Sequence, residues 1–187
     1  MRLAPIVIAL ILPLAACDSG PSVTATNATQ AEVQEKLAAS GAGDTVMVQP
    51  GRWEGAMAIH EIDVPNMPPE AKEQMRAQLS RTNNFVSCVT EEDVKQQKAL
   101  FTGDMDDKSC KYDSFSLSGG KIDARMTCDR GDEGKMTMSM KGDYSADTYR
   151  MDMTSRAEGN SPMGAMSMKM SVNAKRVGVC RGTEDES

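Results

Sequence analysis

Apolar and polar residues alternate with a period of two along much of the chain from residue 51 onward. Between residues 51 and 62, Trp53, Met57 and Ile59 fall on one side of the pattern and polar residues dominate the other. This alternation is typical of a strand with one buried face. The first strand is therefore expected at residues 51 to 62.

Helix and strand signals follow this strand. Pro69 suits the first position of a helix, and the apolar spacing after it extends to residue 79. A second strand is expected at residues 85 to 89. Thr90 suits the N-cap of a helix, and the three acidic residues after it suit the first turn. A short helix ending near residue 101 is therefore expected.

A hairpin is expected between residues 110 and 128, because two alternating runs meet at Gly119 and Gly120. Two glycines suit a two-residue hairpin turn, in which both central residues need positive φ. The resulting register pairs Leu117 with Ile122.

Three further strands are expected at residues 135 to 144, around 149 to 153, and at 166 to 173. Short connections between consecutive strands favour an antiparallel meander. The sequence predicts a mostly β fold: a curved sheet or partial barrel of about seven strands, with one or two short helices. This methionine-rich domain is expected to span residues 48 to 181, followed by an acidic tail at 182 to 187.

The first residues predict export. Arg2 precedes an apolar run at residues 3 to 14, which is too short to span a bilayer core that needs about 20 helical residues. Leu14-Ala15-Ala16-Cys17 resembles a bacterial lipobox, which implies cleavage after residue 16 and a lipid on Cys17. The protein is then expected in the cell envelope, facing the periplasm and anchored to the membrane through Cys17. The choice between inner and outer membrane stays open.

Residues 17 to 47 are expected to form a tether. The segment from Asp18 to Asn27 is small and polar, as in flexible linkers, and is expected to be disordered. A short helix is expected at residues 29 to 40, with Val33 and Leu37 on a narrow apolar face that argues against docking.

The five cysteines become an even set once Cys17 carries a lipid. In the glycine-turn register Cys110 points away from the face of Cys128, so a bond between them would require a bulge. Counting in steps of two from the apolar residues of their strands places Cys128 and Cys180 on the inward-facing side. The sequence therefore favours Cys88 with Cys110 and Cys128 with Cys180, while the other pairings stay open.

Eight methionines repeat at strand spacing, and two interpretations of them are open. Thioethers are ligands that select Cu(I), which makes a Cu(I)- or Ag(I)-binding module an alternative function. Between residues 45 and 180, however, fifteen Met accompany nine Val, three Leu and three Ile, so the core needs the methionines. We interpret them as core or ligand-facing side chains: Met136, Met138, Met140, Met151, Met153, Met166, Met168 and Met170.

No residue pattern indicates catalysis, and an enzyme with an unrecognised site is left as a second alternative function. His60 is the single histidine, and it falls on the polar side of its strand without a nearby nucleophile. Asp104, Asp106 and Asp107 lack the glycine and glutamate of a calcium loop. No metal or other cofactor is expected. The formal charge of −6 excludes an electrostatic surface for nucleic acid.

Several motifs, taken in their order along the chain, resemble those of the Domain of Unknown Function 3617 family, over about residues 48 to 181. The resemblance rests on the following residues in order: Gly51-Arg52-Trp53, Met67-Pro68, Cys88-Val89-Thr90, Cys110 and Cys128 around a glycine hairpin, and Gly178-Val179-Cys180. It implies a small exported proteobacterial protein, often a lipoprotein, with four cysteines in the domain. We therefore expect a non-catalytic envelope protein that binds an apolar ligand or a protein partner.

Overall fold

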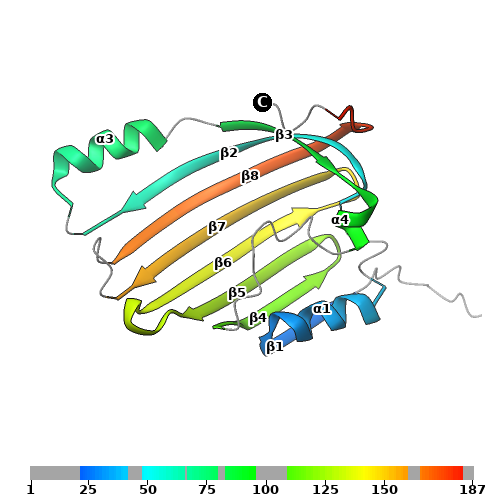
Figure 1. Ribbon diagram of the computed structural model, residues 1–187, viewed down its shortest axis with the longest axis horizontal. Coiled ribbons are helices and arrows are strands. Elements are labelled where there is room, and N and C mark those ends of the chain that lie inside the picture. The colour runs from blue at the N-terminus through cyan, green and yellow to red at the C-terminus, as the bar shows by residue number, and fades with distance from the viewer. Residues whose placement is uncertain are drawn as a thin grey trace, which may run out of the picture.

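The computed structural model describes residues 22–41, 48–65, 67–79, 83–95, 109–159 and 165–182. Eight antiparallel strands form one curved sheet that does not close into a barrel (Figure 1). The predicted mostly β class is confirmed, with eight strands where about seven were expected. The elements in chain order are β1 Val23–Thr29, α1 Gln30–Ala39, β2 Gly51–Asp63, α3 Pro69–Leu79, β3 Asn83–Val89, α4 Glu91–Lys95, β4 Cys110–Ser118, β5 Lys121–Asp129, the 3₁₀ turn Gly131–Glu133, β6 Lys135–Tyr144, β7 Thr148–Glu158 and β8 Met166–Gly178.

The strands lie in the order β1-β4-β5-β6-β7-β8-β2-β3. From β4 to β8 the sheet is the predicted meander, since each strand pairs with the next one in the chain. The pairs β1–β4 and β2–β8 instead join segments that are far apart in the sequence. The edges of the sheet are therefore β1 and β3.

The prediction of a disordered tether is wrong over residues 23–27, because they belong to β1, which pairs with β4. Val23 and Ala25 alternate with exposed threonines and are 4% and 5% exposed. Small residues of this kind resemble a linker in the sequence. They form a strand here because β4 supplies hydrogen-bond partners and an apolar face for alternate side chains.

The predicted helix is confirmed as α1, but the expectation that it does not dock on the sheet is wrong. Thr29 and Glu32 form a reciprocal capping box at its first turn. Val33 and Leu37 are 1% and 0% exposed. Two side chains one turn apart are enough for docking, because both insert into the apolar face beside β4.

The remaining local predictions agree with the structure where it describes the chain. Helix α3 begins at Pro69, β3 contains the strand expected at residues 85 to 89, and Thr90 accepts a hydrogen bond from the backbone N–H of Asp93. The hairpin turns at Gly119 and Gly120, whose φ angles are 57° and 73°.

A bulge in β4 changes the register of the predicted hairpin. Leu117 pairs with Ile122 as expected, but Asp113 is an extra residue between Tyr112 and Ser114. Its carboxylate accepts a hydrogen bond from Thr127 Oγ1 at 2.8 Å. One extra residue moves every preceding side chain to the opposite face relative to an unbroken register.

The predicted disulfide pairing is wrong for this reason. The shifted register sets Cys110 directly opposite Cys128, and the two form a disulfide. Cys88 bonds to Cys180, with a Cα separation of 5.4 Å. Arg52 in β2 pairs with both Cys88 and Gly178, so this second bond joins β3 across β2 to the end of β8.

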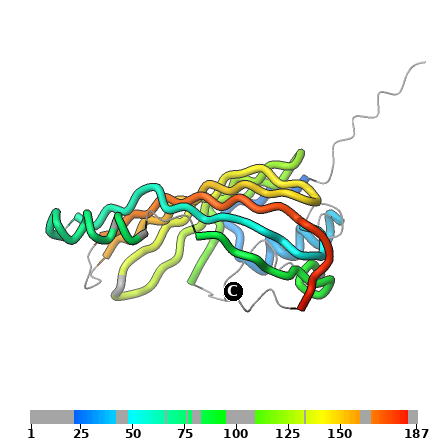
Figure 2. Tube along the Cα trace, turned by 90° about the horizontal axis from the view of Figure 1, so that it is seen from above, coloured from blue at the N-terminus to red at the C-terminus, as the bar shows by residue number. Residues whose placement is uncertain are grey.

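The inner face of the sheet is defined here as the face that carries the main buried cluster, and α1 covers it at the β1–β5 end (Figures 1 and 2). That cluster includes Phe115, Leu117 and Ile122. A smaller cluster surrounds Trp53, whose indole N–H donates to the carbonyl of Gln49 at 3.0 Å. Two apolar clusters thus hold the two ends of the sheet.

Several predictions lie outside the described residues. These are the signal peptide at residues 1–16, Cys17, the tether at 18–21 and 42–47, the helix beyond Lys95, the acidic loop of Asp104, Asp106 and Asp107, and the tail at 183–187. Within the described ranges, none of the helices has the length and apolarity needed to cross a bilayer.

Candidate functional site

The eight candidate methionines share the inner face of the sheet. Strands β6, β7 and β8 pair without a bulge, so alternate residues keep one side along their whole length. Met136, Met138 and Met140 pack against the main buried cluster. The methionine face, as we call it, comprises Met136, Met138, Met140, Met151, Met153, Met166, Met168 and Met170.

Burial on the methionine face is incomplete. Only Met151 among the eight is fully buried, at 5% exposed, and its thioether lies against Gly142 of β6, where a side chain would collide with it. The other seven are partly buried. At the β4–β5 end, in contrast, Phe115 and Leu117 are 2% and 0% exposed. Seven of the eight methionines therefore keep some accessible surface.

The opposite face of the meander is charged. Lys121 pairs with Asp143 at 2.7 Å and Lys141 with Asp123 at 2.9 Å, between neighbouring strands. The hydrogen bond from Lys121 to Asp143 raises the pKa of the lysine. Exposed pairs of this kind contribute little to stability. They mark this face as solvated and leave the methionine face as the apolar side of the sheet.

His60 lies beside a serine that is distant in the sequence. It is the extra residue of a bulge in β2, and its Nε2 is 2.7 Å from Ser171 Oγ. Ser171 is 6% exposed. Among the described residues this is the single hydrogen bond of the His60 side chain, so the pair lacks the third, orienting group of a catalytic triad.

Sequence reasoning did not find the His60–Ser171 pair, because two conditions had to be met together. The bulge between Ile59 and Glu61 decides where the imidazole points, and the long-range pairing of β2 with β8 supplies the serine. Neither has a local sequence signal.

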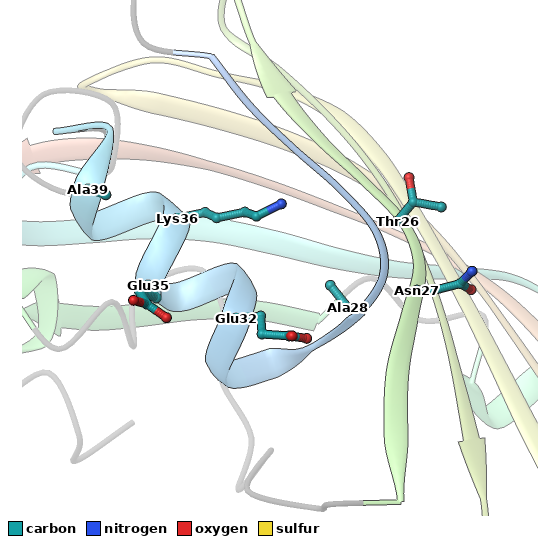
Figure 3. Close-up of a pocket in the computed structure, with 7 residues that line it drawn as sticks. All are labelled: Thr26, Asn27, Ala28, Glu32, Glu35, Lys36 and Ala39. Atoms are coloured by element: carbon teal, nitrogen blue, oxygen red, sulfur yellow. The ribbon is translucent and has the colours of Figure 1, made fainter.

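A hollow of about 400 Å³ lies between β1 and α1 (Figure 3). Ala28 and Glu32 point between strand and helix, whereas Thr26 points away from the helix. Lys36 donates to the carbonyl of Thr24 at 3.3 Å. The backbone N–H of Thr29 donates to Glu32 and lowers the pKa of that carboxyl. Both charged side chains nearest the strand are therefore already bonded, Glu32 to the N-cap of α1 and Lys36 to the edge strand β1.

A second, more open hollow of about 570 Å³ lies over β2, β3 and β8. Phe85 of β3 packs over Gly55 of β2, where a side chain would collide with the ring. Neither hollow is lined by a methionine. In the described part of the chain, no group of three or more His, Cys, Asp or Glu side chains gathers closely enough to hold a metal ion.

Comparison with known proteins gives a family and no activity. No curated protein and no solved structure matches the chain. The family described as "Protein of unknown function (DUF3617)" matches residues 48–180, well over half of the sequence. The matched range contains β2 to β8 with both disulfides, while β1 and α1 precede it. This chain therefore belongs to the DUF3617 family.

Proposed function

We propose that the protein is a bacterial lipoprotein of the cell envelope, held at the membrane by a lipid on Cys17 and facing the periplasm. The lipobox-like residues before Cys17 motivate the location. The two disulfides support it, because they pair all four cysteines of the domain and leave Cys17 as the remaining one. Disulfides persist in oxidising compartments such as the periplasm.

Replacement of Cys17 tests this location. The Cys17→Ser protein should leave the membrane fraction and accumulate as a folded, soluble domain in the periplasm. Mass spectrometry of the wild-type protein should find acyl chains on residue 17. A Cys17→Ser protein that still sediments with membranes would contradict the anchor.

We further propose that the methionine face binds an apolar ligand, without a catalytic step. The observation that carries this proposal is that seven of its eight methionines are only partly buried, beside a well-buried core. Methionine side chains are flexible and polarisable, so a methionine surface adapts to apolar molecules of different shape. The ligand would lie along the sheet surface, because neither described hollow includes these side chains.

A fluorescent naphthylamine dye provides the test of apolar binding. Met153→Gln puts an amide at the centre of the methionine face, and we expect about tenfold weaker dye binding, equivalent to about 1.4 kcal/mol. The matched control is Asp152→Gln, which changes an exposed neighbour on the opposite face of β7. Equal dye affinity in the two variants would refute a ligand site on the methionine face. If the protein binds a protein partner but not the dye, the ligand of the methionine face is a protein and not a small molecule.

A further inference from the structure

Three methionines occupy one lateral row across the centre of the methionine face. Met140 of β6 pairs with Met153 of β7, and Met153 pairs with Met170 of β8. Directly opposed residues of neighbouring strands have Cβ atoms about 5 Å apart. Each thioether sulfur is separated from its Cβ by one methylene and rotates about several bonds, so the two outer sulfurs can turn toward Met153.

The surroundings of this row are apolar. Ala124 flanks Met140 on one side and Ile59 flanks Met170 on the other. The row therefore offers three neutral sulfur donors without a charged side chain among its five members. All three methionines are partly buried, which leaves each of them some access to solvent.

No other row of this face has three consecutive methionines. In the next row Ser155 separates Met138 from Met168, and in the row after that Ala157 separates Met136 from Met166. The register thus sets Met140, Met153 and Met170 apart from the other methionines on the same strands.

We propose that Met140, Met153 and Met170 form a binding site for a soft monovalent cation, Cu(I) or Ag(I), with three thioether ligands. Soft sulfur donors select Cu(I), whereas Ca²⁺ and Mg²⁺ require oxygen ligands and Zn²⁺ takes thiolate, imidazole or carboxylate. The row supplies none of these. The acidic net charge of the chain favours the approach of a cation.

The chemistry of the ligands gives this site a signature. A thioether has no proton to lose, so metal binding releases none at the row. Sites built from Cys or His lose affinity as the pH falls, because their ligands must be deprotonated. The affinity of the methionine row should be the same at mildly acidic and neutral pH.

The test is a titration of the full chain carrying Cys17→Ser, which removes a competing thiol, with Ag(I) and with Cu(I) under anaerobic conditions. Methionine methyl resonances are followed by NMR. The signals of Met140, Met153 and Met170 should shift together and saturate at one ion per chain. Replacement of the three by leucine should abolish this saturable binding.

The leucine substitutions also separate metal binding from apolar-ligand binding, because leucine keeps the apolar volume and removes the sulfur. The Met140→Leu, Met153→Leu, Met170→Leu protein should still bind the naphthylamine dye. The matched control replaces one methionine on each of the same strands outside the row, Met136→Leu, Met151→Leu and Met166→Leu, and should still bind Ag(I). Unmoved row methyls in the parent protein, or equal Ag(I) affinity in both triple variants, would overturn the metal site.

Discussion

Tyr112 illustrates how burial controls the chemistry of one side chain in this sheet. It is 3% exposed and packs edge-to-face on Phe115, with ring centroids 5.5 Å apart. Burial disfavours the phenolate and raises the pKa of Tyr112 from 10.0 to about 12. Burial also raises the pKa of Tyr149 and that of Tyr144, where a hydrogen bond with the Gly120 backbone opposes part of the shift.

This shift predicts a loss of stability in alkali. Below pH 10.0 Tyr112 is protonated in both folded and unfolded chains; above it the unfolded chain ionises first, so stability falls as the pH rises toward about 12. Tyr112→Phe should reduce this loss without removing the part due to Tyr144 and Tyr149. Urea unfolding at a series of pH values measures it. An identical pH dependence in wild type and variant would contradict the role of Tyr112.

Among the elements, β1 and α1 contribute to the core although they precede the family-matched range. Leu37 of α1 is completely buried in the cluster beside β4. Leu37→Ala should lower the free energy of unfolding by about 2 to 5 kcal/mol, because it removes buried methyl groups and leaves a cavity. Chemical denaturation measures the change. Gln34→Ala, on the exposed side of the same helix, is the control, and a similarly small effect of both substitutions would show that the helix does not hold the core.

Local signals made most elements predictable from the sequence. Two glycines with positive φ fix the β4–β5 turn, Pro69 starts α3, and strict alternation identifies β6 to β8. Long-range pairing has no such signal, so the sequence predicts a tether where the structure has β1. The extra residue Asp113 places Cys110 on the face opposite to the expected one, so the disulfide pairing also differs from the prediction.

For the candidate site, the sequence predicts which face carries the methionines but not which of them lie opposite one another. Alternation alone gathers the methionines on one face, since side chains two residues apart share a side of a strand. Their alignment into a row depends on register, which follows from the connection between Tyr144 and Tyr149 and from the pairing of β7 with β8. A shift by two residues would preserve the face and still separate Met140 from Met153.

For the whole molecule, the early start of the sheet limits how far the domain can stand from the proposed lipid. Val23 is already paired in β1, and only residues 18–22 separate it from Cys17. A fully extended chain covers about 3.5 Å per residue, so the edge of the sheet lies within about 20 Å of the anchored residue. Helix α1 lies beside that edge, whereas α3 projects from the far end of the sheet (Figures 1 and 2).

The lipidated protein should therefore sit on vesicles with α1 nearer the bilayer than α3. Fluorophores attached through Glu35→Cys in α1 or Gln74→Cys in α3, both at exposed positions, report the two distances when the lipid headgroups carry a quencher. Quenching should be stronger at position 35, because the short segment after Cys17 restrains the β1 edge while the rest of the sheet extends outward. The same labels on Cys17→Ser protein should show little quenching at either position. Equal quenching of the two labels on the lipidated chain would mean that the sheet lies flat on the membrane, against the orientation inferred from the length of residues 18–22.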